Sequence, residues 1–315
     1  NLFWAVRDLK RYLSFRVSNG DSIITTSPYL IIALSLFSHL KKKLTKVIYI
    51  YHGERFPSSK IESEDTNESV CKKAYDNITR VIFNLLEKRS INSADRIFVF
   101  SKYYQNYLTH KFGLPTTSTI RTIAHGIDKK VFRPKTKHNR AMSRKLYRLP
   151  DNVFVFSYIG RLDPYKGILS LISAFEGLAS SHDACLLIAS PKVESPMAKV
   201  VGDKVGTNGR IRLLHPEKVE TIYWASDCIV SPSHNENASL VLYESFATRN
   251  LFISTPVGRA GEILTKVDPK LIINKPMVDD IVRTLEYCLT LDKKQVKTVL
   301  DKQFSYTLGL DWKKI

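Results

Sequence analysis

The sequence predicts an α/β protein with parallel sheets, and three observations support that prediction. Short apolar, β-branched runs alternate with helical patterns along the chain, which is typical of βαβ units. Some runs, such as VFVFSYIG at 153–160, are apolar throughout, as expected of strands buried on both faces of a sheet. A charged segment without a long apolar run, 133–152, divides the alternation into two halves, so we expect two domains.

The expected strands are short and spread over the whole chain. They are Ser22–Ser27, Lys46–His52, Arg96–Ser101, Arg121–His125, Val153–Gly160, Ala184–Ser190, Arg210–Leu214, Cys228–Ser231, Leu251–Thr255 and Leu271–Ile273. Patterns of helical period predict helices at Ile168–Ala179, Val219–Ala225, Leu240–Thr248 and Asp279–Leu291, and at the start of the chain, where Leu2, Phe3, Val6, Leu9 and Leu13 share one face. Strands and helices therefore alternate on both sides of the charged segment.

The domain organisation follows from this division. We expect a first domain at 1–135, a connection at 136–152, a second domain at 153–300 and a C-terminal helix at 301–315 that crosses back to the first domain. The most apolar stretch, 23–40, contains Pro28 and several polar residues, so we interpret it as a strand and a helix rather than a membrane span.

Composition sets broad limits on function. The 315 residues are 43% hydrophobic and 25% charged, as in a globular protein. Four widely spaced cysteines predict neither a zinc site nor a disulfide framework, and favour a reducing compartment. The net charge of +18 attracts phosphorylated substrates, anionic membranes or nucleic acid, although a generally basic proteome explains it equally well.

The first group of residues that carries chemistry is GRLDPYKG at 160–167, between an expected strand and an expected helix. Ligands bind at the carboxyl ends of strands in open α/β sheets. Gly160 allows a tight turn there, and Arg161 and Lys166 place two cations where they can hold phosphate oxygens. The alternative is an ordinary basic surface loop.

The second group is SPSHNENASLVLYESFA at 231–247, in which two glutamates, Glu236 and Glu244, are eight positions apart. Asn237 or Ser239 can cap the helix that begins near Leu240, and the start of that helix can hold a diphosphate. A carboxylate on an apolar helix needs a partner, and sugar hydroxyls suit it because a carboxylate only accepts hydrogen bonds. The alternative for Glu244 is an exposed acidic residue on an amphipathic helix.

Together these motifs resemble a known family. The chain is similar to the retaining glycosyltransferases of the GT-B fold, family four, the glycogen synthase and mannosyltransferase-like group 1 glycosyltransferases. The resemblance rests on GRLDPYKG, ASDCIVSPS, the glutamate pair, ATRNLFISTPVGRAGEIL at 247–264, IYHG at 50–53, SADRIFVFS at 93–101 and IAHGIDKKVFRP at 123–134. It implies two Rossmann-like domains that face a cleft, with a UDP- or GDP-sugar donor held mainly by the second.

The resemblance also implies residue roles. Arg161 and Lys166 would hold the donor diphosphate, Glu236 would touch the donor sugar, and Glu244 would bind the ribose hydroxyls. His52 would face the donor sugar and the acceptor, although it also fits a capped histidine at a strand end. The backbone around Gly160 and from Asn237 through Ala238 and Ser239 to Leu240 would complete the donor site.

The expected chemistry is retaining, metal-independent glycan biosynthesis without a cofactor. No DxD-type metal motif stands out, so cations and helix amides would stabilise the leaving group. The sequence departs from the family at 237–239, where Asn237, Ala238 and Ser239 replace a GFG loop, which puts donor preference and activity in doubt.

Two other functions stay open. The GT-B fold also carries nucleotide-sugar epimerases and hydrolases. A polyanion-binding protein fits the charge, but nucleic-acid motifs are missing. The expected partners are a nucleotide-sugar and a glycan or lipid-linked acceptor. The expected location is the cytoplasm, with peripheral contact to the inner, anionic face of a membrane as an option that Lys41–Lys43 suggest.

The first domain is expected to be incomplete. A GT-B first domain opens with a strand and a glycine-rich loop, whereas this chain opens with a helix, and Ser22–Ser27 corresponds to the family's fourth strand. We therefore expect a fragment whose complete form has roughly 50–70 further residues, as about two βαβ units of about 30 residues each. Ser22–Ser27 would then be an exposed apolar edge.

Overall fold

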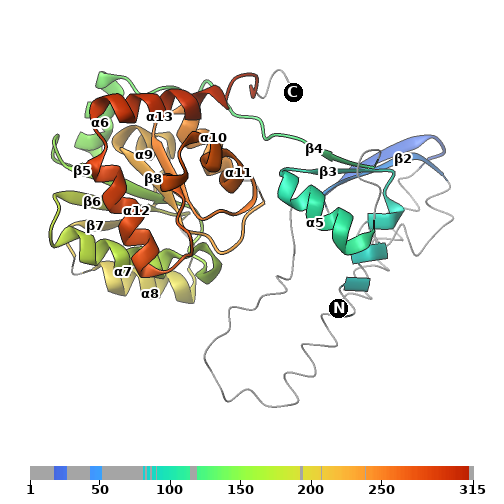
Figure 1. The fold of residues 1–315 in the computed structure, drawn as a ribbon, viewed down its shortest axis with the longest axis horizontal. Coiled ribbons are helices and arrows are strands. Elements are labelled where there is room, and N and C mark those ends of the chain that lie inside the picture. The colour runs from blue at the N-terminus through green and yellow to red at the C-terminus, as the bar shows by residue number, and fades with distance from the viewer. Residues whose placement is uncertain are drawn as a thin grey trace, which may run out of the picture. The chain divides into compact units, whose positions relative to one another are not determined.

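The protein has two units, each with its own parallel sheet (Figure 1). The computed structural model describes residues 18–26, 43–51, 81, 84–85, 87–89, 91–113, 119–191, 194–206, 208–237 and 239–311. Unit 1 is Asn1–Ile123 and unit 2 is Ala124–Ile315. The α/β fold class with two parallel sheets is confirmed. The expected helix at the start of the chain, the helix expected after Pro28, and Lys41–Lys42 of the basic run lie outside the described residues.

The described part of unit 1 is a four-stranded sheet in the order β1-β2-β3-β4. Its strands are β1 (Asp21–Thr25), β2 (Leu44–Ile50), β3 (Arg96–Val99) and β4 (Ile120–Thr122). All neighbours are parallel. Helix α5 (Lys102–Phe112) begins at Ser101, whose hydroxyl accepts from the Tyr104 amide, and ends at Gly113 with φ 65°. Ile24 on β1, the edge strand of this described sheet, is 67% exposed.

Unit 2 contains a five-stranded parallel sheet in the order β7-β6-β5-β8-β9. The strands are β5 (Phe154–Ile159), β6 (Ala184–Ala189), β7 (Ile211–Leu214), β8 (Cys228–Ser231) and β9 (Leu251–Ser254). The chain runs outward from β5 to β6 and β7, then returns to β8 on the other side of β5. The strand order therefore reverses between β5 and β8, which is the ligand-binding position in open α/β sheets.

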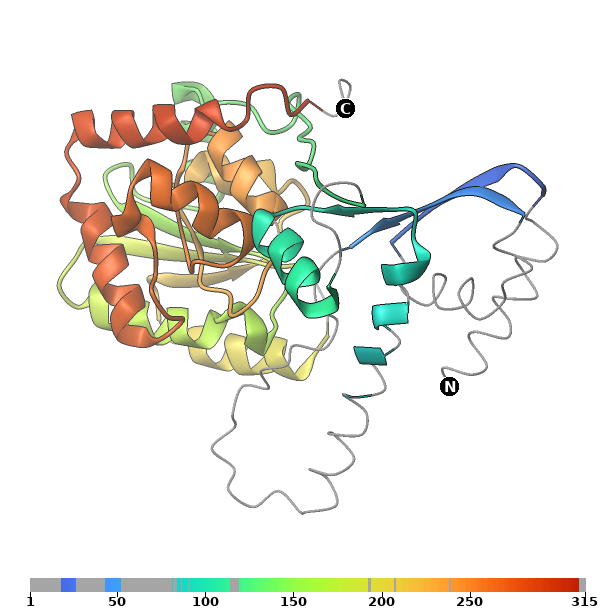
Figure 2. The ribbon, with the colours of Figure 1, turned by 45° about the vertical axis from the view of Figure 1, so that its right-hand side comes forward.

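Helices cover both faces of this sheet, as Figure 2 shows. They are α6 (Lys137–Leu146), α7 (Ile168–Ala179), α8 (Pro196–Val205), α9 (Glu220–Ala225), α10 (Leu240–Ala247), α11 (Gly258–Val267), α12 (Val278–Thr290) and α13 (Lys293–Ser305), with the 3₁₀ turns η1 (Pro164–Lys166) and η2 (Pro269–Leu271). Alternate residues of β5 face opposite layers: Phe156 packs against Phe175 of α7, whereas Val155 clusters with Ile222 of α9. Both faces of β5 are thus buried, as its continuous apolar sequence predicts.

Two segments differ from the sequence expectation. The expected connection at 136–152 contains helix α6, capped by Thr136, and it belongs to unit 2. Of the expected strand Leu271–Ile273, Leu271 ends the turn η2 and Ile272 makes only an isolated bridge with Ser254. Pro269 opens that turn and Asp268 caps it, so the backbone bends before a ladder can form.

The C-terminal helix also begins earlier than expected, at Lys293 rather than near residue 301, and Asp292 caps it. Its predicted return to the first domain stays a prediction. Within the described residues no helix is long and apolar enough to cross a membrane.

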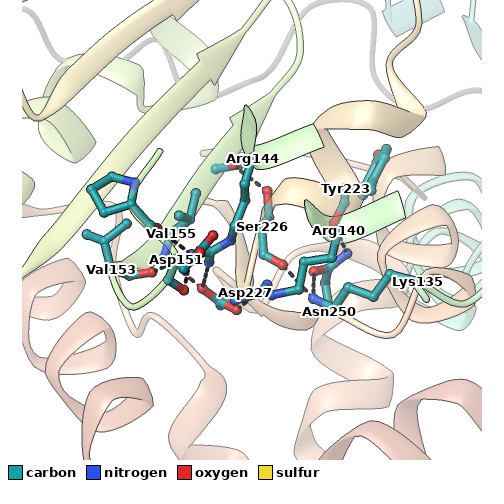
Figure 3. Close-up of polar contacts among 12 residues, drawn as sticks. Lys135, Arg140, Arg144, Asp151, Val153, Val155, Tyr223, Ser226, Asp227 and Asn250 are labelled. Carbon is teal, nitrogen blue, oxygen red and sulfur yellow. Dashed lines mark hydrogen bonds and ion pairs between the residues drawn. The ribbon is translucent and has the colours of Figure 1, made fainter. Parts of the chain in front are cut away.

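An ion network around the buried Arg144 explains why the charged segment folds onto unit 2 (Figure 3). The Arg144 side chain of α6 is 1% exposed, and its Nη2 lies 2.7 Å from Asp227 Oδ2. Arg140 Nη1 lies 2.8 Å from Asp227 Oδ1, and the Val155 amide donates to Asp227 Oδ2. Arg144 Nη1 also donates to the carbonyls of Pro150, Asp151 and Val153. Charge pairing, and not an apolar stripe, therefore joins α6 to the amino ends of β5 and β8.

We predict that Asp227→Asn destabilises unit 2 by about 3 kcal/mol, because it leaves the Arg144 guanidinium buried without its counter-charge. Urea unfolding monitored by circular dichroism would measure the loss. The matched control is Arg283→Met, since Arg283 pairs with Asp280 at 63% side-chain exposure and should cost less than about 1 kcal/mol. Equal midpoints for the Asp227 variant and the wild type would contradict the role given to the network.

Candidate functional site

The candidate site begins at the loop that follows β5. Gly160 has φ 157°, and the Tyr158 hydroxyl donates to the Arg161 carbonyl at 2.6 Å, which shapes the turn. The Asp163 carboxylate accepts from the Tyr165 amide and caps η1. Arg161 is exposed, so this loop presents an unburied guanidinium at the carboxyl end of β5.

A second loop, after β8, packs directly on the first. Gly167 has φ 69°, and a Cβ placed there would lie 2.1 Å from the Pro232 carbonyl oxygen. The His234 amide donates to the Tyr165 carbonyl at 2.8 Å. Burial lowers the pKa of His234. The two loops are thus joined by backbone contacts that a side chain at Gly167 would prevent.

The joined loops bring two predicted site residues together. Lys166 Nζ and Glu236 Oε1 form an ion pair, and both side chains are 21% exposed. The pair joins residues 70 positions apart in the chain. Because each comes from a different strand end, the strand-end rule alone predicts their proximity.

A third loop, after β9, leads into α11, whose first residues pack against the second loop. Gly258 opens α11 with φ 51°, and a Cβ there would lie 2.0 Å from the Asn237 carbonyl oxygen and 2.3 Å from that of Glu236. The Arg259 amide donates to the Asn237 carbonyl at 3.0 Å. The backbone of Glu236 and Asn237 is therefore held against α11, and Asn237 is only 7% exposed.

Helix α10 begins immediately after this loop. Ser239 occupies the N-cap position, but its side chain makes no capping hydrogen bond, so of the two expected caps, Asn237 or Ser239, the serine is wrong. The backbone at Ser239 is extended, at φ −71° and ψ 131°, as it is at Asp292, which does cap α13. Leu240, the first helical residue, is 44% exposed. The positive end of the helix is consequently accessible to an anion.

Glu244 lies one turn further along α10 and is held by a tyrosine. The Tyr223 hydroxyl donates to Glu244 Oε2 at 2.5 Å, and Tyr223 is fully buried in α9. Burial raises the pKa of Glu244, which the hydrogen bond from Tyr223 partly offsets. The side chain is neither an exposed surface acid nor an unpartnered buried one.

The structure places most of the predicted site residues at the carboxyl ends of β5 and β8. These are Gly160, Arg161, Lys166, Glu236, Asn237, Ser239, Leu240 and Glu244. His52 and Ala238 lie outside the described residues. Sequence reasoning missed Tyr223, His234 and Gly258 as parts of the site. Only Gly258 had a usable signal, since glycine in the PVGRAG segment indicates a close backbone approach.

Comparison with known proteins gives a concordant result. Residues 139–299 match the family described as "Glycosyl transferases group 1". The D-inositol 3-phosphate glycosyltransferase of Corynebacterium efficiens is 26% identical over 221 residues, which is 67% of this chain and 49% of that protein. This chain thus spans about half the length of the curated relatives that it matches.

Solved structures share the fold. A glycosyltransferase from Rickettsia africae aligns with TM-score 0.70 and 18% identity, over 98% of this chain and 76% of that one. Anabaena HepE, in complex with UDP and glucose, aligns with TM-score 0.73 and 14% identity, over 98% of this chain and 77% of that one. At these identities the likeness shows the fold alone, and that fold is GT-B, as the motifs predict.

We predict that Gly258→Ala destabilises the protein by about 2 kcal/mol or more, because it combines a left-handed φ with a backbone clash against Glu236 and Asn237. Gly177→Ala is the matched control, since Gly177 is an exposed position of helix α7 with nothing within 4 Å of the added Cβ. It should stabilise the chain by about 0.5–1 kcal/mol. Urea midpoints would compare the two, and similar effects from both would contradict the close contact at Gly258.

Proposed function

The chain belongs to the glycosyl transferases group 1 family, and on that premise we propose that it moves a sugar from a nucleoside-diphosphate sugar to an acceptor hydroxyl. One observation carries the proposal. Two cations and an accessible helix N-terminus gather where the strand order of unit 2 reverses, at the ends of β5 and β8. This combination of charge and backbone donors suits a diphosphate.

The diphosphate would lie across the start of α10. The amides of its first turn and the positive end of its dipole, equivalent to roughly half a charge, attract an anion. Arg161 can contact two phosphate oxygens, and Lys166 acts as a point charge. Gly160 and the backbone from Asn237 to Leu240 would let the phosphates approach closely.

Glu236 and Glu244 would bind the two sugars of the donor. Glu236 already pairs with Lys166, so an incoming diphosphate would share that lysine and leave Glu236 oxygens for the transferred sugar. Glu244 would accept hydrogen bonds from the ribose, since a carboxylate has only acceptor sites. The pair is therefore not an acid and base that flank one glycosidic bond.

The proposed reaction is retaining and needs no metal. The bond between the sugar and the nucleoside diphosphate breaks, the acceptor oxygen bonds to the same face of the sugar, and a donor phosphate oxygen takes the acceptor's proton. Arg161, Lys166 and the amides of α10 would stabilise the charge that develops on the departing diphosphate. His52 would face the donor sugar and the acceptor.

The acceptor is proposed to be an anionic compound with a hydroxyl group, such as a glycan or a lipid-linked molecule. The net charge of +18 supports this choice, because it attracts polyanions. The curated relatives are named for inositol 3-phosphate, which is itself a phosphorylated hydroxyl compound. We propose peripheral contact with an anionic membrane for the same reason, the net positive charge of the chain.

We predict that Arg161→Ala and Lys166→Ala each weaken nucleoside-diphosphate binding about tenfold or more, because each removes a charge-assisted contact with phosphate. A thermal-shift panel of UDP, GDP and ADP would select the best ligand, and calorimetry in EDTA would measure its affinity. Lys145→Ala is the matched control, because Lys145 is exposed on α6 at the amino end of the sheet and should leave affinity unchanged.

Three outcomes would count against the proposal. Unchanged affinity in both site variants would remove the phosphate assignment. Turnover of the corresponding nucleotide-sugar that stops in EDTA and returns with magnesium or manganese would contradict the metal-independent leaving group. Transfer to water alone, without any acceptor, would favour a hydrolase.

A further inference from the structure

We infer that Tyr223 is a positioning residue that sets the ribose selectivity of this site by holding the carboxylate of Glu244 in one orientation. The inference rests on the proposed function, in which Glu244 binds ribose. The hydroxyl of Tyr223 donates to Glu244 Oε2 at 2.5 Å. One carboxylate oxygen is thereby occupied by the protein, which leaves Oε1 for a ribose hydroxyl.

The tyrosine is itself fixed from several directions. Its ring is fully buried and meets Phe132 edge-on, with ring centroids 5.6 Å apart. The Asn250 side-chain amide donates to the Tyr223 carbonyl at 2.9 Å and to Thr248 Oγ1 at 2.9 Å. A buried ring with a fixed backbone leaves the phenolic oxygen little freedom, so the position of Glu244 Oε2 is determined by the core.

A lysine extends this chain of contacts away from the site (Figure 3). Lys135 Nζ donates to Asn250 Oδ1 at 2.7 Å and to the carbonyl of Ser226, the C-cap residue that follows α9. Burial lowers the pKa of Lys135 to about 8. The lysine thus orients the Asn250 amide, whose NH₂ then has to face the Tyr223 carbonyl.

The charge states of the pair favour this arrangement. Burial, together with the nearby Glu244 charge, raises the pKa of Tyr223 well above its usual value, so the phenol keeps its proton and stays a donor. Burial raises the pKa of Glu244 and so disfavours its ionised form. The hydrogen bond from Tyr223 acts in the opposite direction, because an ionised carboxylate accepts hydrogen bonds and cannot donate them. An ionised carboxylate of fixed orientation is the better acceptor for a ribose hydroxyl.

Tyr223→Phe tests this idea, because it removes only the hydroxyl and keeps the buried ring. The probes are the best-binding diphosphate of the UDP, GDP and ADP panel and its 2′-deoxy counterpart, with affinities measured by calorimetry. The wild type should prefer the ribonucleotide about tenfold or more, since a lost hydrogen bond to a charged group costs at least that. The variant should prefer it by about threefold or less.

Two further variants separate positioning from general stability. Tyr287→Phe removes an equivalent hydroxyl that donates to the Asp268 carboxylate at 2.6 Å, and it should keep the wild-type preference. In a Glu244→Ala background, Tyr223→Phe should change the preference no further, because a residue that acts through Glu244 has no effect without it.

The possible results are distinguishable. A Tyr223 variant that keeps the wild-type preference, or loses affinity equally for both nucleotides, would overturn the inference while leaving the proposed function in place. A wild type that binds a diphosphate without preferring ribose would also overturn it. A wild type that binds none of the diphosphates would overturn the proposed function, and the inference with it.

Discussion

The candidate site depends on two places where backbone meets backbone because glycine carries no side chain. Gly167 brings the loop after β5 against Pro232, and Gly258 brings the start of α11 against Glu236 and Asn237. Both glycines have φ in the left-handed region, so both close contact and conformation select glycine. Without these contacts the two loops that carry Lys166 and Glu236 would not be held together. The ion pair between them is a consequence of loop packing rather than its cause.

The two ends of the unit 2 sheet carry different groups: an ion network that stabilises the fold at one end, and the candidate site at the other. At the amino ends of β5 and β8, the buried Arg144 pairs with the partly buried Asp227 and donates to backbone carbonyls. At the carboxyl ends, Lys166 and Glu236 are partly exposed, and the Ser239 side chain does not cap α10. The buried Arg144 thus lies at the amino ends of the strands and the exposed Arg161 at the carboxyl ends, which agrees with the general position of sites in open α/β sheets.

The sequence predicts the sheets well because its signal is local. Continuous apolar runs such as 153–160 belong to strands buried on both faces, and the loops after them carry the cations and carboxylates. Helix α6 could not be predicted in this way. Its residues carry no apolar stripe, and Arg144 is buried through a charge on Asp227, 83 positions away. The short β-branched run 271–273 has the sequence pattern of a strand but does not form one, since Pro269 turns the chain before it.

The same limit applies within the site. The meeting of Lys166 with Glu236 follows from strand order, whereas the bond from Tyr223 to Glu244 depends on how α9 packs beside α10, which no local pattern encodes. A single Glu244 in an apolar helix indicates that a partner exists but not which one.

The central claim is that the start of α10, together with Lys166, forms a diphosphate site. A crystal structure of the full chain with the best-binding nucleoside diphosphate tests it most directly. We predict phosphate oxygens at about 3 Å from the first-turn amides of α10 and from Lys166 Nζ, with the ribose on Glu244. A nucleotide whose phosphates lie away from both α10 and Lys166 would contradict it.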